Sequence, residues 1–191
     1  MNFLGHLYLS GTDPLVMVGN FMGDAVKGRD LSRFEPRLEQ GLRMHRTIDS
    51  FTDTHPLQRA GRARVHPHAG RYAGVVMDLF YDHVLAANWK EFHGEELAVF
   101  AERAYTTLMA HETLMPERTR NMLPYMVKGD WLSTYATLEG MGRALAGLAR
   151  RVPMGASMIG AEQVLADHLE LYTMEFREFL PAIKTEVAPY Q

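Results

Sequence analysis

His45 and Asp49 are the residues whose type and spacing point most directly to chemistry. They lie in a segment where Pro36 and the apolar spacing predict a helix from Pro36 to about Thr54. At about 100° per residue, Asp49 lies about 40° around this helix from His45, within the same apolar arc. Because burying an unpaired carboxylate is costly, the two side chains either pair with each other or bind a metal ion. Imidazole and carboxylate suit a divalent cation, and the spacing allows both interpretations.

Asp78 and Asp82 form a second pair, one turn apart on a helix expected over about 70–89. The two carboxylates share one border of the apolar stripe, and His83 lies at the other border. This i, i+4 spacing suits two ligands of one metal ion. The alternative is a pair of like charges on a solvated face, which destabilises a helix slightly.

Asp24 and His6 are weaker candidates when each is taken alone. Asp24 follows a segment that begins with Gly19 and ends with Gly23, and these glycines permit the close approach of a helix or a ligand. The alternative interpretation of Asp24 is a residue of a solvated turn. His6 stands within an apolar stretch, where a hydrogen-bonded core histidine is more typical than a ligand. Three further histidines are weaker still and are expected in loops: His55, His66 and His68.

Taken together, these core-side groups on separate helices predict a metal site. The candidates are His6, Asp24, His45, Asp49, Asp78 and Asp82. A helical bundle can gather such groups around one or two cations, and Mg²⁺ or Mn²⁺ there would polarise a phosphoryl oxygen and activate water. The sequence has no Gly-rich phosphate loop, nucleophile elbow or Rossmann fingerprint, which disfavours nucleotide-fuelled chemistry and hydride transfer.

The elements that must position these residues are expected to be helices throughout. Besides the two helices above, start signals and apolar spacing predict helices over about 2–9, 14–26, 94–114, 117–127, 130–151 and 156–180, and a short helix or loop over 57–69. No segment alternates as a strand does. A chain of 191 residues with 47% hydrophobic residues fits one all-α domain, a helical bundle spanning 1–191.

Composition excludes several other classes of protein. The absence of cysteine rules out disulfides, thiolate metal sites and cysteine nucleophiles, whereas nine histidines leave imidazole and carboxylate for metal binding. No apolar run is long enough for a transmembrane helix, and the N-terminal stretch lacks the basic region of a signal peptide. We therefore expect a cytoplasmic protein.

Charge is distributed unevenly along the chain. The total of 20 Lys+Arg and 23 Asp+Glu gives −3, which argues against nucleic-acid binding. Residues 27–71 hold ten Lys/Arg and five Asp/Glu, a local balance of +5. This excess indicates either an ordinary solvated face or a docking surface for an acidic partner.

Several short stretches jointly resemble one known family, in colinear order over essentially the whole chain. They are Met1-Asn2-Phe3-Leu4 with His6-Leu7, Gly19-Asn20 with Asp24, Gly41 with His45-Arg46 and Ile48-Asp49, Thr52-Asp53, Leu79 within Asp78 to His83, Trp89, and Trp131-Leu132 with Tyr135. The family that they resemble is acyl carrier protein phosphodiesterase, also called acyl carrier protein hydrolase.

The resemblance implies a fold and an activity. The family is all-helical and is a distant member of the HD phosphohydrolase superfamily, whose sites bind divalent metal through His and Asp. It hydrolyses the phosphodiester that joins 4′-phosphopantetheine to the serine of holo-acyl carrier protein, giving apo-acyl carrier protein. Mn²⁺ is the expected ion, with Mg²⁺ as the second choice. Since Asp82-His83 has the order opposite to His–Asp, the superfamily's ligand set cannot be copied directly.

Under this resemblance, each candidate residue receives a role. The expected metal ligands are Asp24, His45, Asp78 and Asp82, followed by His83. Asp49 would ligate the metal or orient His45. Water activated by the metal would attack phosphorus in line with the serine oxygen, while Arg46 and Lys27 stabilise phosphoryl charge and His6 protonates the leaving serine.

The acidic carrier protein is the expected partner. Its docking face would be Lys27, Arg59, Arg62, Arg64 and Arg71 in the basic segment. Two other functions fit the residues: the same metal chemistry on a small phosphodiester or nucleotide, and a helical module that binds acyl carrier protein without cleaving it.

Overall fold

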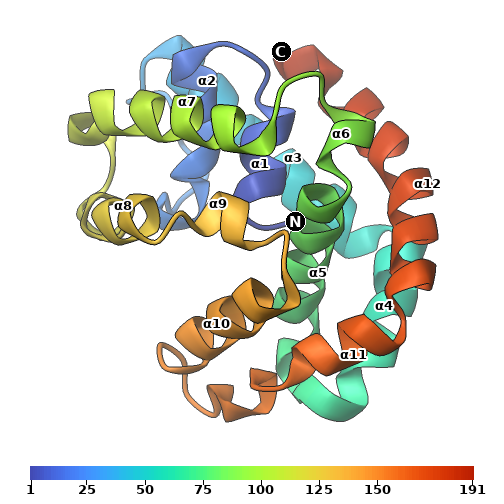
Figure 1. Cartoon of the computed structure of the whole chain (residues 1–191). Coiled ribbons are helices and arrows are strands. Elements are labelled where there is room, and N and C mark those ends of the chain that lie inside the picture. Colours follow the sequence, from blue (N-terminus) through green and yellow to red (C-terminus); the bar gives the residue numbers. More distant parts are fainter.

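The structure, a computed structural model, describes residues 1–191 and contains no β-strand, which confirms the all-α class (Figure 1). Its α-helices are α1 (Phe3–Leu9), α2 (Pro14–Phe21), α3 (Pro36–Thr54), α4 (Pro56–Ala69), α5 (Ala73–Ala87), α6 (Trp89–Phe92), α7 (Leu97–Ala110), α8 (Glu117–Lys128), α9 (Trp131–Thr134), α10 (Leu138–Ala149), α11 (Ala161–Asp167) and α12 (Leu169–Val187). Short 3-10 turns join them: η1 (Gly23–Ala25), η2 (Gly70–Tyr72), η3 (Glu112–Leu114), η4 (Gly155–Met158) and η5 (Ala188–Tyr190).

Proline and capping side chains set where three helices begin. Pro14, Pro36 and Pro56 each stand in the first turn, where the missing N–H would have no helical partner. The carboxylates of Asp13 and Glu35 accept main-chain N–H groups just inside α2 and α3. The helix predicted from Pro36 to Thr54 is confirmed with these bounds.

Other predicted segments need correction. The segment 57–69 is part of a full helix, α4, so His66 and His68 lie on a helix and not in a loop. The remaining long segments are divided: 14–26 into α2 and η1, 94–114 into α7 and η3, 130–151 into α9 and α10, and 156–180 into η4, α11 and the start of α12. Apolar spacing continues across these breaks because the helices on both sides pack on one core. The helices are interrupted by local features that the spacing does not show, such as the N-cap residue Thr137 and the positive φ of Gly160.

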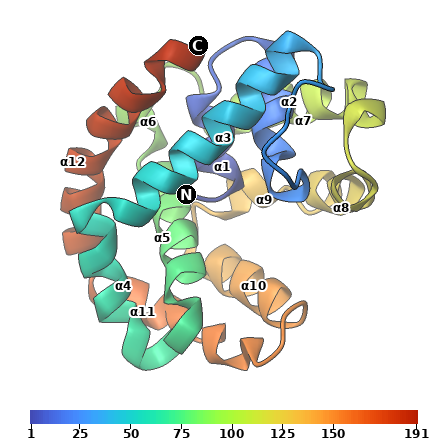
Figure 2. The same ribbon diagram turned by 180° about the vertical axis from the view of Figure 1, so that it is seen from behind.

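Two glycines let α2 and α3 cross with their backbones in contact (Figure 2). A Cβ on Gly19 would lie 2.3 Å from the carbonyl oxygen of Leu38, and one on Gly41 would lie 2.2 Å from that of Val16. Only glycine fits at either position, since real Cβ atoms do not approach backbone atoms so closely. The close crossing brings the C-terminal end of α2 against the middle of α3, where His45 lies.

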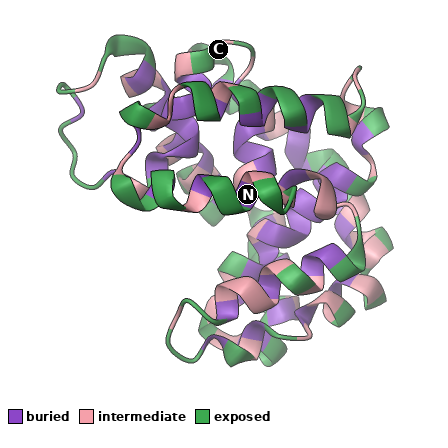
Figure 3. Ribbon diagram, turned by 60° about the vertical axis from the view of Figure 1, so that its left-hand side comes forward, coloured by how far each residue is buried: buried purple, intermediate pink, exposed green.

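Helix α5 runs through the centre of the molecule. It packs against α1, α4, α10 and α12, and most of its residues are buried (Figures 1 and 3). Its contact with α1 fixes the start of the chain, and α1 carries His6. None of the helices combines the length and apolar character that a membrane span would need.

Candidate metal and active site

Helices α1 and α3 bring two buried histidines together. The rings of His6 and His45 stack with centroids 4.4 Å apart and an interplanar angle of 29°. Only 5% of His6 and 6% of His45 are exposed. A Cβ on Gly23 would lie 2.2 Å from Cγ of His45, so this glycine makes room for the ring. The sequence therefore places both imidazoles in one small space, against the turn that carries Asp24.

Asp49 joins the two histidines, one turn beyond His45 on α3. Its Oδ1 lies 3.3 Å from Nε2 of His6, and its Oδ2 lies 3.1 Å from Nε2 of His45. Asp24, on η1, adds an Oδ1 3.5 Å from the same His45 nitrogen. The side chain of Asp49 is 45% exposed and that of Asp24 84%, so both carboxylates face solvent while the imidazoles are covered. We call His6, His45 and Asp49 the His–Asp cluster.

The electrostatics of the cluster favour a cation. Burial lowers the pKa of His6. Burial also opposes protonation of His45, but hydrogen bonds to Asp24 and Asp49 outweigh it and raise the pKa of His45 to about 9. The hydrogen bond to His45 lowers the pKa of Asp24. Burial would raise the pKa of Asp49, yet its hydrogen bond to His45 holds it well below its usual range. Two carboxylates therefore stay ionised beside the imidazoles.

The cluster fits a divalent metal ion in its donor set and spacing. One ligand atom from each of its three residues lies within 4.8 Å of the other two. Two imidazoles and one carboxylate form a donor set that first-row divalent cations accept. A neutral His6 whose Nδ1 carries the proton also turns its Nε2 lone pair toward a carboxylate oxygen, and a cation between them would remove that repulsion. The cluster is therefore a candidate metal site, and it contains the predicted His45, Asp49 and His6.

Asn20 contacts Nδ1 of both histidines, and the sequence analysis assigned it no role in the site. Its side-chain Oδ1 lies 2.8 Å from Nδ1 of His6, and its main-chain oxygen lies 2.8 Å from Nδ1 of His45. The signal in the sequence was a fully polar side chain within the otherwise apolar helix α2. A buried amide must find partners, but periodicity does not say which ones.

Asp82 lies in a different set of contacts, at the start of α1. Its Oδ1 accepts N–H groups of Asn2 at 3.0 Å and Gly5 at 3.1 Å, and its Oδ2 accepts that of Leu4 at 2.8 Å. Burial raises the pKa of Asp82 to about 7, against the effect of these bonds and of the N-terminal ammonium. The carboxylate of Asp82 thus caps the N-terminus of α1, a helix that lies about 80 residues earlier in the chain.

Asp78 and His83 complete what we call the α5 group, together with Asp82. Asp78 Oδ1 forms an ion pair of 2.9 Å with the α-ammonium of Met1. Burial raises the pKa of Asp78, while the ammonium lowers it. Nδ1 of His83 lies 2.8 Å from the carbonyl oxygen of Tyr135, and burial lowers the pKa of His83. The structure therefore does not bring these three predicted ligands into the His–Asp cluster.

The predicted basic residues divide into engaged and free side chains. Arg62 pairs with Asp53, and Arg64 pairs with Glu175. Arg71 donates to the carbonyl oxygen of Pro153 at 2.7 Å. The exposed side chains of the remaining two form neither an ion pair nor a hydrogen bond; they are Lys27 and Arg59.

Arg46 follows His45 on α3 and contacts the segment after η1 at Gly28. Its Nη2 donates to the carbonyl oxygen of Gly28 at 2.6 Å, at a position whose φ of +91° favours glycine. Its other guanidinium N–H groups have no acceptor in the protein and are partly exposed. The residue is thus close in sequence to the cluster, with donors to spare for an anion.

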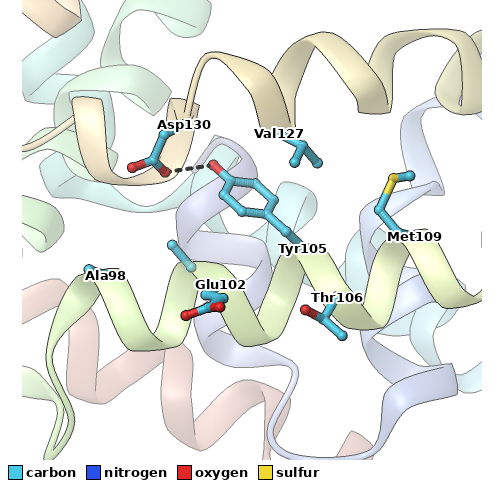
Figure 4. A pocket seen from close by; sticks show the side chains of 8 residues that line it. Ala98, Glu102, Tyr105, Thr106, Met109, Val127 and Asp130 are labelled. Atoms are coloured by element: carbon cyan, nitrogen blue, oxygen red, sulfur yellow. Dashed lines mark hydrogen bonds between the residues drawn. The ribbon is translucent and has the colours of Figure 1, made fainter.

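A surface pocket of about 460 Å³ lies elsewhere, between α7 and α8 (Figure 4). Apolar side chains of Ala101, Met109 and Val127 line much of it, and Tyr105 donates a hydrogen bond of 3.1 Å to Asp130 at one side. None of the candidate site residues lines this pocket. It gives no reason to move the site away from the His–Asp cluster.

Comparison with known proteins gives a consistent result. The family model described as acyl carrier protein phosphodiesterase matches residues 1–183. Proteins of that name from Yersinia enterocolitica and Serratia proteamaculans are each 31% identical to this chain, with 100% of both chains covered. One from Photorhabdus laumondii is 32% identical over 95% of this chain and 92% of its own. No solved structure matches. The chain belongs to the acyl carrier protein phosphodiesterase family.

Proposed function

We propose that this protein hydrolyses the phosphodiester between 4′-phosphopantetheine and the serine of holo-acyl carrier protein, with the help of a divalent metal ion. The products would be apo-acyl carrier protein and 4′-phosphopantetheine. Family membership supports the substrate, and the observation that carries the chemistry is the His–Asp cluster, with two buried imidazoles facing one partly exposed carboxylate.

His6, His45 and Asp49 would hold the ion through Nε2, Nε2 and a carboxylate oxygen. Asp24 is the next ligand, because its oxygen already lies 3.5 Å from His45 Nε2 and its exposed side chain is free to move. When bound, the ion would polarise a phosphoryl oxygen and activate water for attack. The mixed set of imidazole and carboxylate donors suits Mn²⁺ better than Mg²⁺, which prefers an all-oxygen shell.

The chain's own groups would do the remaining work. The exposed side of Asp24 and Asp49 gives the phosphodiester access, and the free N–H groups of Arg46 would bind its non-bridging oxygens. With Nε2 of His6 used as a ligand, His6 would no longer be the acid at that nitrogen. The leaving serine oxygen would then take its proton from solvent.

For the α5 group we propose support rather than ligation. Asp78 and Asp82 hold the first residues of α1, and α1 in turn holds His6 in the cluster. His83 anchors the loop after α9 through Tyr135. Direct ligation by these residues would require them to leave partners that already satisfy them.

The acidic carrier protein would dock on the free cations of the basic segment 27–71. Lys27 lies three residues after Asp24, and Arg59 lies on α4; neither has a partner within the chain. Arg62, Arg64 and Arg71 would contribute less because they are engaged. Charge steering of this kind predicts that turnover falls as salt rises.

The test is intact-mass spectrometry of holo-acyl carrier protein after incubation with this protein, with Mn²⁺ in one tube and chelator in another. We expect a mass loss of one phosphopantetheine with Mn²⁺ only. Asp49→Asn should abolish the loss, whereas Glu178→Gln, an exposed position without side-chain partners, should not.

Other outcomes would replace the proposal. Cleavage of nucleotides or small phosphodiesters with the carrier protein left intact would point to a different substrate for the same metal chemistry. A stable complex with the carrier protein, without cleavage and without stoichiometric metal, would point to a binding module.

A further inference from the structure

We infer that Asn20 is the positioning residue of the site: it fixes the proton of both histidines on Nδ1 and so presents both Nε2 atoms to the metal ion. The inference rests on the proposed metal site and adds a residue that does not touch the metal or the substrate. It concerns one residue on α2 that contacts two rings on two other helices, His6 through its side chain and His45 through its main-chain oxygen.

The orientation of the Asn20 amide is set by its donors. This side chain is fully buried. Its Nδ2 donates to the carbonyl oxygen of His6 at 2.8 Å and to Oγ of Ser10 at 2.9 Å. Ser10 Oγ in turn donates to the same His6 oxygen at 2.8 Å, which leaves its lone pair for the amide. A reversed amide would place an oxygen against a carbonyl oxygen, so Oδ1 must be the atom that faces His6.

From this orientation the tautomer of His6 follows. Oδ1 of an amide only accepts, and it lies 2.8 Å from Nδ1 of His6. Nδ1 therefore carries the proton and donates. In the neutral ring Nε2 is then a bare lone pair, and it points at Asp49 Oδ1, 3.3 Å away.

His45 is fixed in the same sense by the backbone of the same residue. The main-chain oxygen of Asn20 also only accepts, and it lies 2.8 Å from Nδ1 of His45. The close crossing of α2 and α3 at Gly19 and Gly41 brings this oxygen within reach. One residue thus orients two rings, and outer contacts of this kind set the tautomer and the direction of metal-binding histidines.

The side chain of Asn20 contacts His6 and its main chain contacts His45, so a substitution at this position should affect only one of the two rings. Asn20→Leu keeps the size of the side chain and removes its hydrogen bonds to His6 and Ser10, but it keeps the main-chain oxygen that faces His45. We expect nitrogen-resolved NMR of the metal-free protein to show the Nδ1–H form of His6 at neutral pH, and a mixture with the Nε2–H form in Asn20→Leu. His45, examined above its pKa of about 9, should keep Nδ1–H in both proteins.

Two further variants keep the test valid if Asn20→Leu folds poorly. Asn20→Asp retains an acceptor for His6 Nδ1, so this nitrogen should stay protonated, although the variant loses the donor to the His6 carbonyl oxygen. Ser10→Ala removes one partner of the amide and should shift His6 in the same direction as Asn20→Leu, but less. As a matched control, Asn88→Ala removes an amide that donates only to Val84 at the end of α5 and should change neither ring.

Metal binding gives the second readout. Titration with Mn²⁺ alone should show affinity about 10–100-fold weaker in Asn20→Leu and unchanged in Asn88→Ala, the usual effect of losing an outer hydrogen bond. The inference is overturned if His6 in the unaltered protein carries its proton on Nε2, or if Asn20→Leu leaves both tautomer and affinity unchanged. Neither measurement uses the carrier protein, so failure of the proposed substrate would be seen separately.

Discussion

The His–Asp cluster and the α5 group contain the same residue types at the same helical spacing but differ in what satisfies them. His45 and Asp49 lie one turn apart on α3, as Asp78 and Asp82 do on α5. In the cluster, a carboxylate faces imidazole nitrogens and remains open to solvent. In the α5 group, Asp78 forms an ion pair with the N-terminal ammonium, and Asp82 accepts hydrogen bonds from three main-chain N–H groups. The i, i+4 spacing of ionisable residues is therefore compatible with a site in both regions, and the contacts of the carboxylates distinguish the two regions.

The largest effect should come from the cluster. His45→Ala and Asp49→Ala should each lower turnover of holo-acyl carrier protein on the order of 10³-fold, because a lost ligand removes several kcal/mol of transition-state stabilisation. Steady-state assays with saturating Mn²⁺ would measure this. Glu178→Ala on α12 is the control and should keep full activity. If His45→Ala were as active as the Glu178→Ala control, the His–Asp cluster would not be the active site.

The α5 group should respond in stability instead. Asp82→Ala leaves three N–H groups without an acceptor, two of them buried, and should cost about 3 kcal/mol, a fall in Tm of roughly 6–12 °C. Calorimetry would measure the change. At a temperature where the variant is folded, its turnover should far exceed that of His45→Ala. A folded Asp82→Ala protein as inactive as His45→Ala would argue for ligation by Asp82.

A glycine in each region allows a finer comparison. A Cβ on Gly23 would lie 2.2 Å from Cγ of His45, whereas one on Gly5 would lie 2.3 Å from Cε of Met1 and 3.0 Å from Oδ1 of Asp82. Both Gly→Ala changes should destabilise the fold by about 1–3 kcal/mol. Gly23→Ala should also weaken Mn²⁺ binding in titrations, because it displaces the ring of His45. Gly5→Ala should leave the Mn²⁺ affinity unchanged.

Gly147→Ala provides the control for both glycine variants. This residue lies inside α10 with open space around it, so the change should raise stability slightly. Equal loss of Mn²⁺ affinity in the Gly5 and Gly23 variants would remove the distinction between the two regions.

The smallest expected effect is a dependence of stability on pH in the metal-free protein. Because the folded pKa of His45 is raised to about 9, its contribution is fully present below the unfolded pKa near 6.5 and is lost as pH rises through 9. Its partners are partly exposed, so we expect a loss on the order of 1–2 kcal/mol. Thermal unfolding with chelator between these pH values would show it, and His45→Gln should flatten the slope.

Helical periodicity was enough to predict the all-α class, the bounds of α3 and the burial of His45, whereas the side chain of Asp49, expected in the same apolar arc, is 45% exposed. It could not place His6 beside them, since α1 and α3 meet only through the packing of the whole chain. It also could not show that Asp82 caps α1, because the acceptor and its N–H donors are about 80 residues apart and main-chain donors carry no sequence signal.

Charge gave a similar mixture of success and failure. The excess of basic residues over 27–71 is plain in the sequence, but Arg64 is engaged by Glu175, a residue 111 positions away. Asn20 illustrates the same limit for the site itself. Its polarity within an apolar helix was visible, and its two histidine partners depended on the glycine crossing of α2 and α3.

The most direct test of the difference between the two regions is anomalous X-ray diffraction from crystals of this protein grown with Mn²⁺. We expect one strong manganese peak within coordination distance of Nε2 of His6, Nε2 of His45 and the carboxylate of Asp49. A peak bounded instead by Asp78, Asp82 and His83, with the His–Asp cluster empty, would contradict the assignment of the site.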